Sequence, residues 1–434
     1  MLALSAAHAS RFSTSTAVAT RPFRELVSYV IPHAKKAEQQ ARTFTTTTPA
    51  MSGTQGIIAE AFSCSVNRPQ TAAKHPQAFY EKKPHHLKNS RGFQNPWDSW
   101  TDGGITQIFK GVLTHRYKNG FGGPVTEPAP NVIKPTFPST RSTDTTELRA
   151  TWLGHACFYV EFPGGLRVLF DPVFSDRCSP SQFIGPKRYT KKPCDIEDIP
   201  EIDVVCISHN HYDHTDHATL MKILKKFPNC QYFVPLGNKE WFTSCGIKTC
   251  TEMDWWEDRE VELTVKEGKL NATIGLLPCQ HTSGRGLTDR SLTLWGSWYV
   301  KSGGKNVYFA GDTGYRAVPQ ESDGKDDYAA EYESLPVCPA FKEIGEHRGE
   351  FDLGLIPIGA YVPRCPMHAD PKDAVNIFLD TKCKKAIGMH WGTWVLTDEP
   401  VMEPPTRLKE ALAAKGLEET GVFDAIDIGE SRVY

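Results

Sequence analysis

The amino-acid sequence predicts an α/β (or α+β) fold in which sheets are layered against helices. From Leu148 onward, short runs rich in β-branched and aromatic residues recur, and segments with helical spacing of apolar residues lie between some of them. Elements of these two kinds pack as layers around a shared core. With 434 residues, of which 39% are hydrophobic, the chain can bury such a core without disulfides or a structural metal. A metal cluster in this chain would therefore serve chemistry.

The individual elements are predicted from these runs and from local start signals. Asp370 is suited to cap a helix, because Pro371 follows it at the first helical position. Helices are expected at residues 218–227, 371–379 and 405–415. Strands are expected at residues 150–153, 158–162, 167–170, 204–207, 232–234, 273–277, 292–300, 307–310, 353–358 and 386–389.

The first 51 residues differ in composition from the rest of the chain. They are rich in Ser, Thr and Ala, and their basic residues are opposed only by Glu25 and Glu38. This composition is typical of a mitochondrial transit peptide. A disordered tail without an address is the alternative, and translation from Met51 would remove the segment. The predicted location is mitochondrial or membrane-associated within the cell, and cytosolic if translation starts at Met51.

Residues 52–145 are predicted to form an extension that wraps a main domain at residues 146–434. The extension has few periodic apolar runs, and residues 119–124 have the Gly and Pro content of a turn. Residues 95–100 include two Trp and are expected to anchor the extension by packing. A loosely ordered linker is the alternative. Within the main domain, the polar residues 316–337 are predicted to form a surface insertion.

Composition excludes several classes of function. The formal net charge of −2 gives no electrostatic basis for binding nucleic acid. None of the twelve cysteines forms a Cys-x-x-Cys pair, so zinc ribbons and thioredoxin-like sites are not expected. We instead expect reduced thiols in an intracellular compartment. No apolar stretch reaches the roughly 18 residues that a transmembrane helix needs.

The strongest chemical signal is the run from His209 to His214, HNHYDH, which directly follows an apolar strand. His209 and His211 are two residues apart, so on an extended chain they point the same way. Asp213 and His214 come next and could serve a second ion. This spacing suits two metal ions roughly 3.5–4 Å apart. Four metal-type side chains within six residues are hard to explain as ordinary buried or surface residues.

Three further candidate ligands also follow apolar runs: His281, Asp312 and His390. A buried strand is a rigid support, so loops leaving several strands can aim side chains at one point. Imidazole and carboxylate ligands suit zinc, with iron or manganese as alternatives. Taken singly, each of the three would be interpreted as an ordinary residue. They become candidate ligands because the compact motif is present in the same chain.

The motif His-x-His-x-Asp-His is that of the metallo-β-lactamase superfamily. More specifically, the chain resembles the N-acyl-phosphatidylethanolamine-hydrolysing phospholipase D family. The matching segments run in order from about residue 150 to the last strands: TWLGH (151–155), FDPVFS (170–175), SPSQ (179–182), GPKR (185–188), ISHNHYDH (207–214), DWW (254–256), LWGSW (294–298), FAGDTGY (309–315), PIGAY (357–361) and HWGT (390–393).

The resemblance implies an αββα four-layer sandwich and a site with two zinc ions. One ion would take His209, His211 and His281, and the other would take Asp213, His214 and His390. Asp312 would bridge them. The implied reaction is hydrolysis of N-acyl-phosphatidylethanolamine to phosphatidic acid and an N-acylethanolamine. The implied partner is a phospholipid at a membrane surface. A homodimer is left open.

The resemblance also points to residues near the metals, each with an alternative. Asp171 would accept a hydrogen bond from a ligand imidazole, or would be a turn residue before Pro172. His155 would lie at the site, or would be a buried hydrogen-bonded histidine. His368 would orient the phosphate or protonate the leaving group. Lys187 and Arg188 could attract a phosphate, although a solvated pair is the more common role of such residues.

Two other functions remain open on the sequence alone. The first is another hydrolase of the same superfamily, such as a lactonase, a thioester hydrolase or a nuclease. The second is a metal-binding protein without catalysis. A structural zinc site normally closes four ligands around one ion, so a larger ligand set favours an enzyme.

Overall fold

The computed structural model describes residues 62–71, 74–76, 81–89, 91–101, 128–141, 145–286, 288–319, 328–332, 334–362 and 364–434. The segment 1–51, the turn at 119–124 and part of the insertion at 316–337 lie outside these residues. In the described part of the chain no helix is long and apolar enough to cross a membrane.

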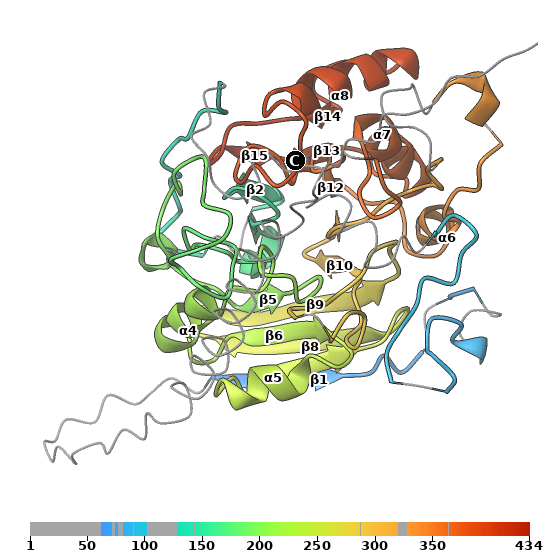
Figure 1. The fold of residues 1–434 in the computed structure, drawn as a ribbon. Coiled ribbons are helices and arrows are strands. Elements are labelled where there is room, and N and C mark those ends of the chain that lie inside the picture. Colours follow the sequence, from blue (N-terminus) through green and yellow to red (C-terminus); the bar gives the residue numbers. More distant parts are fainter. Residues whose placement is uncertain are drawn as a thin grey trace, which may run out of the picture. The chain divides into compact units, whose positions relative to one another are not determined.

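Two sheets form the centre of the domain (Figure 1). The first has the strand order β1 (Ser63–Asn67), β8 (Asp258–Val265), β9 (Gly268–Leu277), β10 (Ser297–Ser302), β11 (Lys305–Phe309), β12 (Leu353–Pro357), β13 (Ala386–Met389) and β14 (Phe423–Asp424). The second has the order β15 (Ser431–Val433), β2 (Arg149–Trp152), β3 (Phe158–Glu161), β4 (Arg167–Phe170), β5 (Val204–Cys206), β6 (Gln231–Pro235) and β7 (Cys250–Met253).

The central strands β4, β5 and β6 of the second sheet are buried along their whole length. In β5, Val204 and Cys206 join the core that lies between the two sheets. Val205 points the other way and packs with Leu220 and Ile223 of the helix α4 (His217–Lys226). Successive side chains of a strand alternate between faces, so one apolar run fills two layers of the core.

Helices cover the outer faces of both sheets. The helices α4 and α5 (Lys239–Ser244) pack on the second sheet. The helices α6 (Ala340–His347), α7 (Pro371–Asp380) and α8 (Glu403–Ala414) pack together on the side of β12, and Figure 1 shows these three grouped away from α4 and α5. Short 3-10 helices occur at η1 (Pro163–Gly165), η2 (Ile196–Asp198) and η3 (Ala330–Tyr332). The predicted αββα sandwich is confirmed.

Most predicted elements lie within a residue or two of their predicted positions. The side chain of Asp370 accepts from the backbone N–H of Asp373, so the predicted cap of α7 is confirmed. The predicted strand at 292–300 is wrong in its first half. Leu294 N–H donates to Leu236 O, and Gly296 N–H donates to Ser208 O, so these residues tie loops together before β10 begins. All twelve cysteines are free thiols, as expected.

The N-terminal region makes specific contacts with the domain. The strand β1 pairs antiparallel with β8 and extends the first sheet. Asn95 donates from Nδ2 to His281 O over 2.7 Å, and Trp97 stacks on Trp255 with ring centroids 5.5 Å apart. Residues 95–100 therefore contact the loop that carries a predicted metal ligand.

Candidate metal centre

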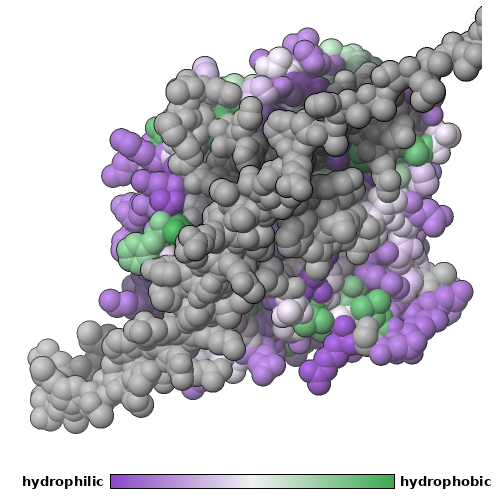
Figure 2. Space-filling view, viewed as in Figure 1, coloured by the Kyte–Doolittle hydropathy of each residue, from purple (hydrophilic) through white to green (hydrophobic). Residues whose placement is uncertain are grey.

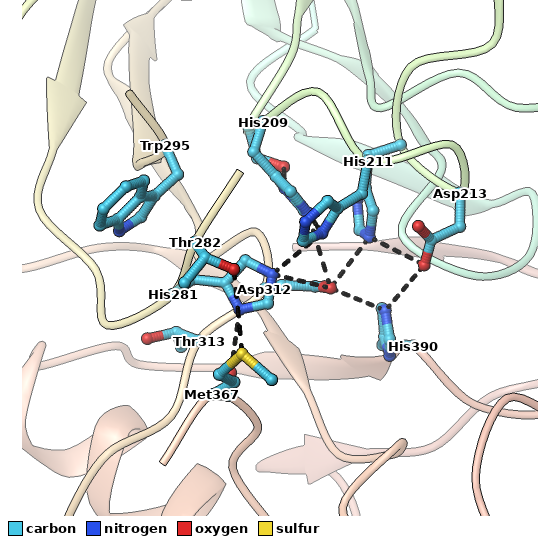
Figure 3. Close-up of polar contacts among 12 residues, drawn as sticks. His209, His211, Asp213, His281, Thr282, Trp295, Asp312, Thr313, Met367 and His390 are labelled. Carbon is cyan, nitrogen blue, oxygen red and sulfur yellow. Dashed lines mark hydrogen bonds and ion pairs between the residues drawn. The ribbon is translucent and has the colours of Figure 1, made fainter. Parts of the chain in front are cut away.

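The predicted ligands converge because each follows a strand of one of the two sheets. His209, His211, Asp213 and His214 follow β5 of the second sheet. From the first sheet, His281 follows β9, Asp312 follows β11, and His390 follows β13. Figure 3 labels all of these residues except His214 and shows the labelled ligands pointing toward one another, with the carboxylate of Asp312 among the imidazoles. The structure thus brings all seven predicted ligands into one centre.

Three imidazoles form the first half of the centre. His209 Nε2 lies 2.8 Å from His211 Nδ1, and His281 Nε2 lies 3.3 Å from the same His211 atom. All three ligand nitrogens lie within 4.8 Å of one another. Burial lowers the pKa of each of these three histidines, and for His209 and His281 the pKa is held well below its usual range. Neutral imidazoles are the form that binds metal.

The second half of the centre holds a carboxylate and two imidazoles. Asp213 Oδ2 lies 3.4 Å from His214 Nε2 and 3.6 Å from His390 Nε2. Although burial would raise it, the pKa of Asp213 is held well below its usual range by His214 and its neighbours. Burial lowers the pKa of His390, but Asp312 and Asp213 outweigh it and raise the pKa to about 9.

Asp312 lies between the two halves. Its Oδ2 atom is 3.0 Å from His390 Nε2 and 3.1 Å from His214 Nε2 in one half. The same atom is 3.8 Å from His281 Nε2 and 3.9 Å from His209 Nε2 in the other half. One carboxylate oxygen therefore faces imidazoles of both halves, as a bridging ligand would.

The chemistry of this cluster fits bound cations. Asp312 Oδ1 is buried and has no hydrogen-bond partner in the described structure, and His214 Nε2 and His390 Nε2 lie close to Asp312 Oδ2 without hydrogen-bond geometry. Buried polar atoms without a partner are costly, and a metal ion satisfies such atoms. The raised pKa values of His214 and His390 show that the two carboxylates favour positive charge at this position. The side chains thus form a site for metal ions.

Asp171 contacts the imidazole of one candidate ligand, His214. It follows β4 and is buried, with Oδ2 lying 2.7 Å from His214 Nδ1. Ser208 holds this carboxylate by donating its backbone N–H to Oδ1 and its hydroxyl to Oδ2, and its hydroxyl oxygen also lies 2.9 Å from His209 Nδ1. Asp171 and Ser208 therefore fix the orientation of two ligand imidazoles. Ser208 has no sequence signal beyond its place beside the motif.

Backbone strain is concentrated at this centre. His155, Asp171 and His390 all have positive φ, at 53°, 37° and 66°. Such conformations are unfavourable for residues with a Cβ and persist where the surrounding packing enforces them. Three residues around one cluster have such conformations, which indicates that the fold holds these side chains in place at a cost in conformational free energy.

His155 contacts the second half of the centre. Its Nε2 atom lies 2.9 Å from Asp213 Oδ2, and its ring centroid lies 4.0 Å from that of His390. Thr393 accepts the backbone N–H of His155 over 2.6 Å. His155 is thus placed to hold Asp213 in position, and burial lowers its pKa to about 3.

His368 lies beside one histidine of each half of the centre. Its ring centroid lies 5.1 Å from that of His281 and 5.4 Å from that of His390. Its Nδ1 atom is buried and has no hydrogen-bond partner in the described structure. The loop that carries it also orients a ligand, because Met367 O lies 3.1 Å from His281 Nδ1.

Lys187 and Arg188, the predicted phosphate-attracting pair, have different surroundings in the structure. Arg188 is partly buried, donates to Ser175 O and lies over the ring of Trp394 at 4.4 Å, and its buried Nη1 atom has no hydrogen-bond partner in the described structure. Lys187 is exposed. Sequence reasoning missed Arg285, which donates from Nη1 to the backbone of Asn210 inside the metal motif. A lone arginine after a ligand gives no signal for this brace.

A hollow of about 340 Å³ opens beside the centre. His155 and His390 line it together with apolar residues such as Trp394, Leu396 and Val401 and with the polar Thr397 and Glu399. The rings of His155 and Trp394 meet edge to face, with centroids 5.0 Å apart. The hollow therefore borders the second half of the centre, and its lining is mixed in polarity.

Comparison with known proteins identifies the family of this chain. The profile of the beta-lactamase superfamily domain matches residues 166–391. N-acyl-phosphatidylethanolamine-hydrolyzing phospholipase D 1 of Caenorhabditis elegans is 37% identical over 362 residues, which are 79% of this chain and 93% of that protein. The chain belongs to this phospholipase D family. It is accordingly a metal-dependent hydrolase, and its histidine and aspartate cluster is the candidate metal centre.

Other relatives are more distant or match a smaller part. The mitochondrial N-acyl-phosphatidylethanolamine-hydrolyzing phospholipase D of Saccharomyces cerevisiae is 35% identical over 61% of this chain and 52% of its own length. An uncharacterized protein of Mycobacterium tuberculosis is 35% identical over 62% of this chain and 65% of its own length. Among solved structures, a metallo hydrolase of Ignicoccus hospitalis covers 67% of this chain and 99% of its own, at 18% identity and a TM-score of 0.44.

Replacing Asp171 with Asn is expected to weaken metal binding by about 10–100-fold, because an amide is a poorer acceptor for the imidazole of His214. The shape is kept, so the fold should persist. The measurement is metal content after dialysis against graded chelator, with Asp198→Asn, an exposed aspartate of η2, as the control. Equal metal retention in both variants would show that Asp171 does not orient the ligand.

Proposed function

We propose that this enzyme is a zinc-dependent phosphodiesterase of the phospholipase D type. Its substrate is N-acyl-phosphatidylethanolamine, and its products are phosphatidic acid and an N-acylethanolamine. The observation that carries the proposal is the position of Asp312 Oδ2, which faces imidazoles of both halves of the centre. Two metals bridged by a carboxylate suit hydrolysis of a phosphodiester.

In this proposal each half of the centre would hold one zinc ion. Asp312, which faces imidazoles of both halves, would be a ligand of both ions. When bound, the metal pair activates a water molecule and polarises a phosphoryl oxygen. Imidazole and carboxylate ligands suit zinc, and iron or manganese are the alternatives that metal analysis would reveal.

The reaction adds water to phosphorus and breaks the bond between phosphorus and the oxygen of the N-acylethanolamine. One proton of the water ends on the released alcohol. His155 keeps Asp213 in place through the 2.9 Å contact, and so preserves the geometry of the second half. His368, with a buried nitrogen facing no protein partner, is placed to hydrogen-bond an oxygen of the phosphate.

One further observation supports a lipid substrate. The related proteins of Caenorhabditis elegans and Saccharomyces cerevisiae are named for hydrolysis of this lipid. A mitochondrial location is part of the proposal, supported by the name of the yeast relative and by the basic, acid-poor residues 1–51.

The test is to incubate the purified protein with a panel of phospholipids and to identify the released product by mass spectrometry. We expect N-acylethanolamine from N-acyl-phosphatidylethanolamine, loss of the product with chelator, and its return with zinc. His209→Ala should release none, although its circular dichroism should match that of the unaltered protein. Sustained hydrolysis by a folded His209→Ala protein, or release of another head group only, would refute the proposal.

A further inference from the structure

The loop formed by residues 177–187, here called the tip loop, carries a large apolar side chain into solvent. Phe183 is 91% exposed, the largest fraction among the exposed large hydrophobic residues of the described structure. Ile184 beside it is 46% exposed. Where the face drawn in Figure 2 is coloured, hydrophobic residues form small separate groups among hydrophilic ones.

Hydrogen bonds at the base of the tip loop keep Phe183 and Ile184 in solvent. Arg177 and Lys187 form an antiparallel bridge, and Cys178 N–H donates to Pro186 O over 3.2 Å. Gln182 closes the loop from within, accepting from Arg177 N–H at 3.1 Å and donating to Arg177 O at 2.9 Å. A braced loop cannot fold its apolar tip back onto the protein without breaking these bonds.

Charge around the tip loop is mainly positive. Lys187 is exposed and forms no ion pair with any carboxylate in the described part of the chain. Lys191, four residues on, is also exposed. Asp176 is the exposed acid at the base of the loop. An apolar tip with a basic side chain beside it complements a lipid bilayer, whose acyl region is apolar and whose phosphates are anionic.

The tip loop is tied to the metal centre. Trp394 donates from Nε1 to Asp176 O over 3.3 Å, and Arg188 lies over its ring. The same Trp394 lines the hollow beside His390 and meets the ring of His155. A surface that captured the tip loop would thus be held near the opening of the hollow.

We propose that the tip loop is a bilayer anchor in which Phe183 and Ile184 insert into the lipid interface and Lys187 contacts anionic head groups. The choice of a bilayer as the bound surface rests on the proposed function, since a phospholipid substrate brings the enzyme to a bilayer. A single Phe and a single Ile give weak, reversible association, which suits an enzyme that must move between substrate molecules.

The experiment measures binding of the full-length protein to vesicles that contain no N-acyl-phosphatidylethanolamine, so it does not depend on catalysis. Phe183→Ser together with Ile184→Ser should lower partitioning by about tenfold or more, on phosphatidylcholine vesicles and on vesicles with one third phosphatidylglycerol. Lys187→Gln should lower it about fivefold on the anionic vesicles only, with the difference shrinking in high salt. Leu379→Ser, at a residue 42% exposed on α7, is the matched control and should bind as the unaltered protein does.

Because Phe183 and Ile184 are exposed, their replacement leaves the core intact. Equal vesicle binding by the double variant and the control would overturn the anchor. A change in oligomeric state by light scattering, without a change in vesicle binding, would assign the tip loop to a contact between copies of the chain and would also overturn it. If the anchor binds but N-acyl-phosphatidylethanolamine is not hydrolysed, the proposed function fails and the anchor stands.

Discussion

Replacing Asp312 with Asn is expected to reduce hydrolysis by at least about 10³-fold while leaving the protein folded. The amide keeps the shape of the side chain but loses the negative charge that faces four imidazoles. Two-metal stabilisation of developing charge contributes several kcal/mol, and each 1.4 kcal/mol is about tenfold in rate. The measurement is kcat with zinc in excess, together with the zinc content of the dialysed variant.

The matched control for this variant is Glu419→Gln, at an exposed carboxylate in the turn before β14. It should retain full activity and full zinc content. An Asp312→Asn protein with two zinc ions and nearly unaltered kcat would show that Asp312 is not a bridge.

Removal of the metal is expected to abolish hydrolysis but to leave the fold in place, because the core between the sheets does not include the ligands. Circular dichroism should therefore change little when chelator is added, while product formation stops. Adding zinc back should restore activity. Unfolding on chelation would mean that the metals hold the structure together.

Rebinding of zinc is expected to release protons. In the metal-free chain, burial opposes the protonated form, yet Asp312 and its neighbours raise the pKa of His390 to about 9 and that of His214 well above its usual range. Raised pKa values favour the protonated form of both imidazoles, so zinc should displace protons from them, and its apparent affinity should fall as the pH falls. Calorimetry in buffers of different protonation enthalpy measures this release. A heat independent of buffer would contradict it.

The sequence predicted the ligands because each stands at the end of an apolar strand. Local runs such as 204–207 and 386–389 give the strand, and the residue type gives the ligand. The convergence of His281, Asp312 and His390 with the motif is a matter of sheet order, which no local pattern encodes. Resemblance to a family supplied that step, and the structure confirms that these side chains meet.

Contacts between distant segments were not predictable. Asp254 accepts from Lys83 over 2.7 Å and lies 2.7 Å from His85 Nε2, and these contacts fasten the N-terminal region beside Trp255. Each of these residues looks ordinary in its own stretch of sequence. The strand β8 was missed in the same way, because its alternating charged residues gave no apolar run although it pairs with both β1 and β9 in the first sheet.

The account depends most on there being two metals joined by Asp312, and anomalous diffraction at the zinc edge on crystals of the protein tests this directly. We expect two peaks about 3.5–4 Å apart. One should contact His209, His211 and His281, the other should contact Asp213, His214 and His390, and Asp312 should contact both. A single peak closed by four protein ligands, or two peaks with Asp312 touching only one, would contradict the account.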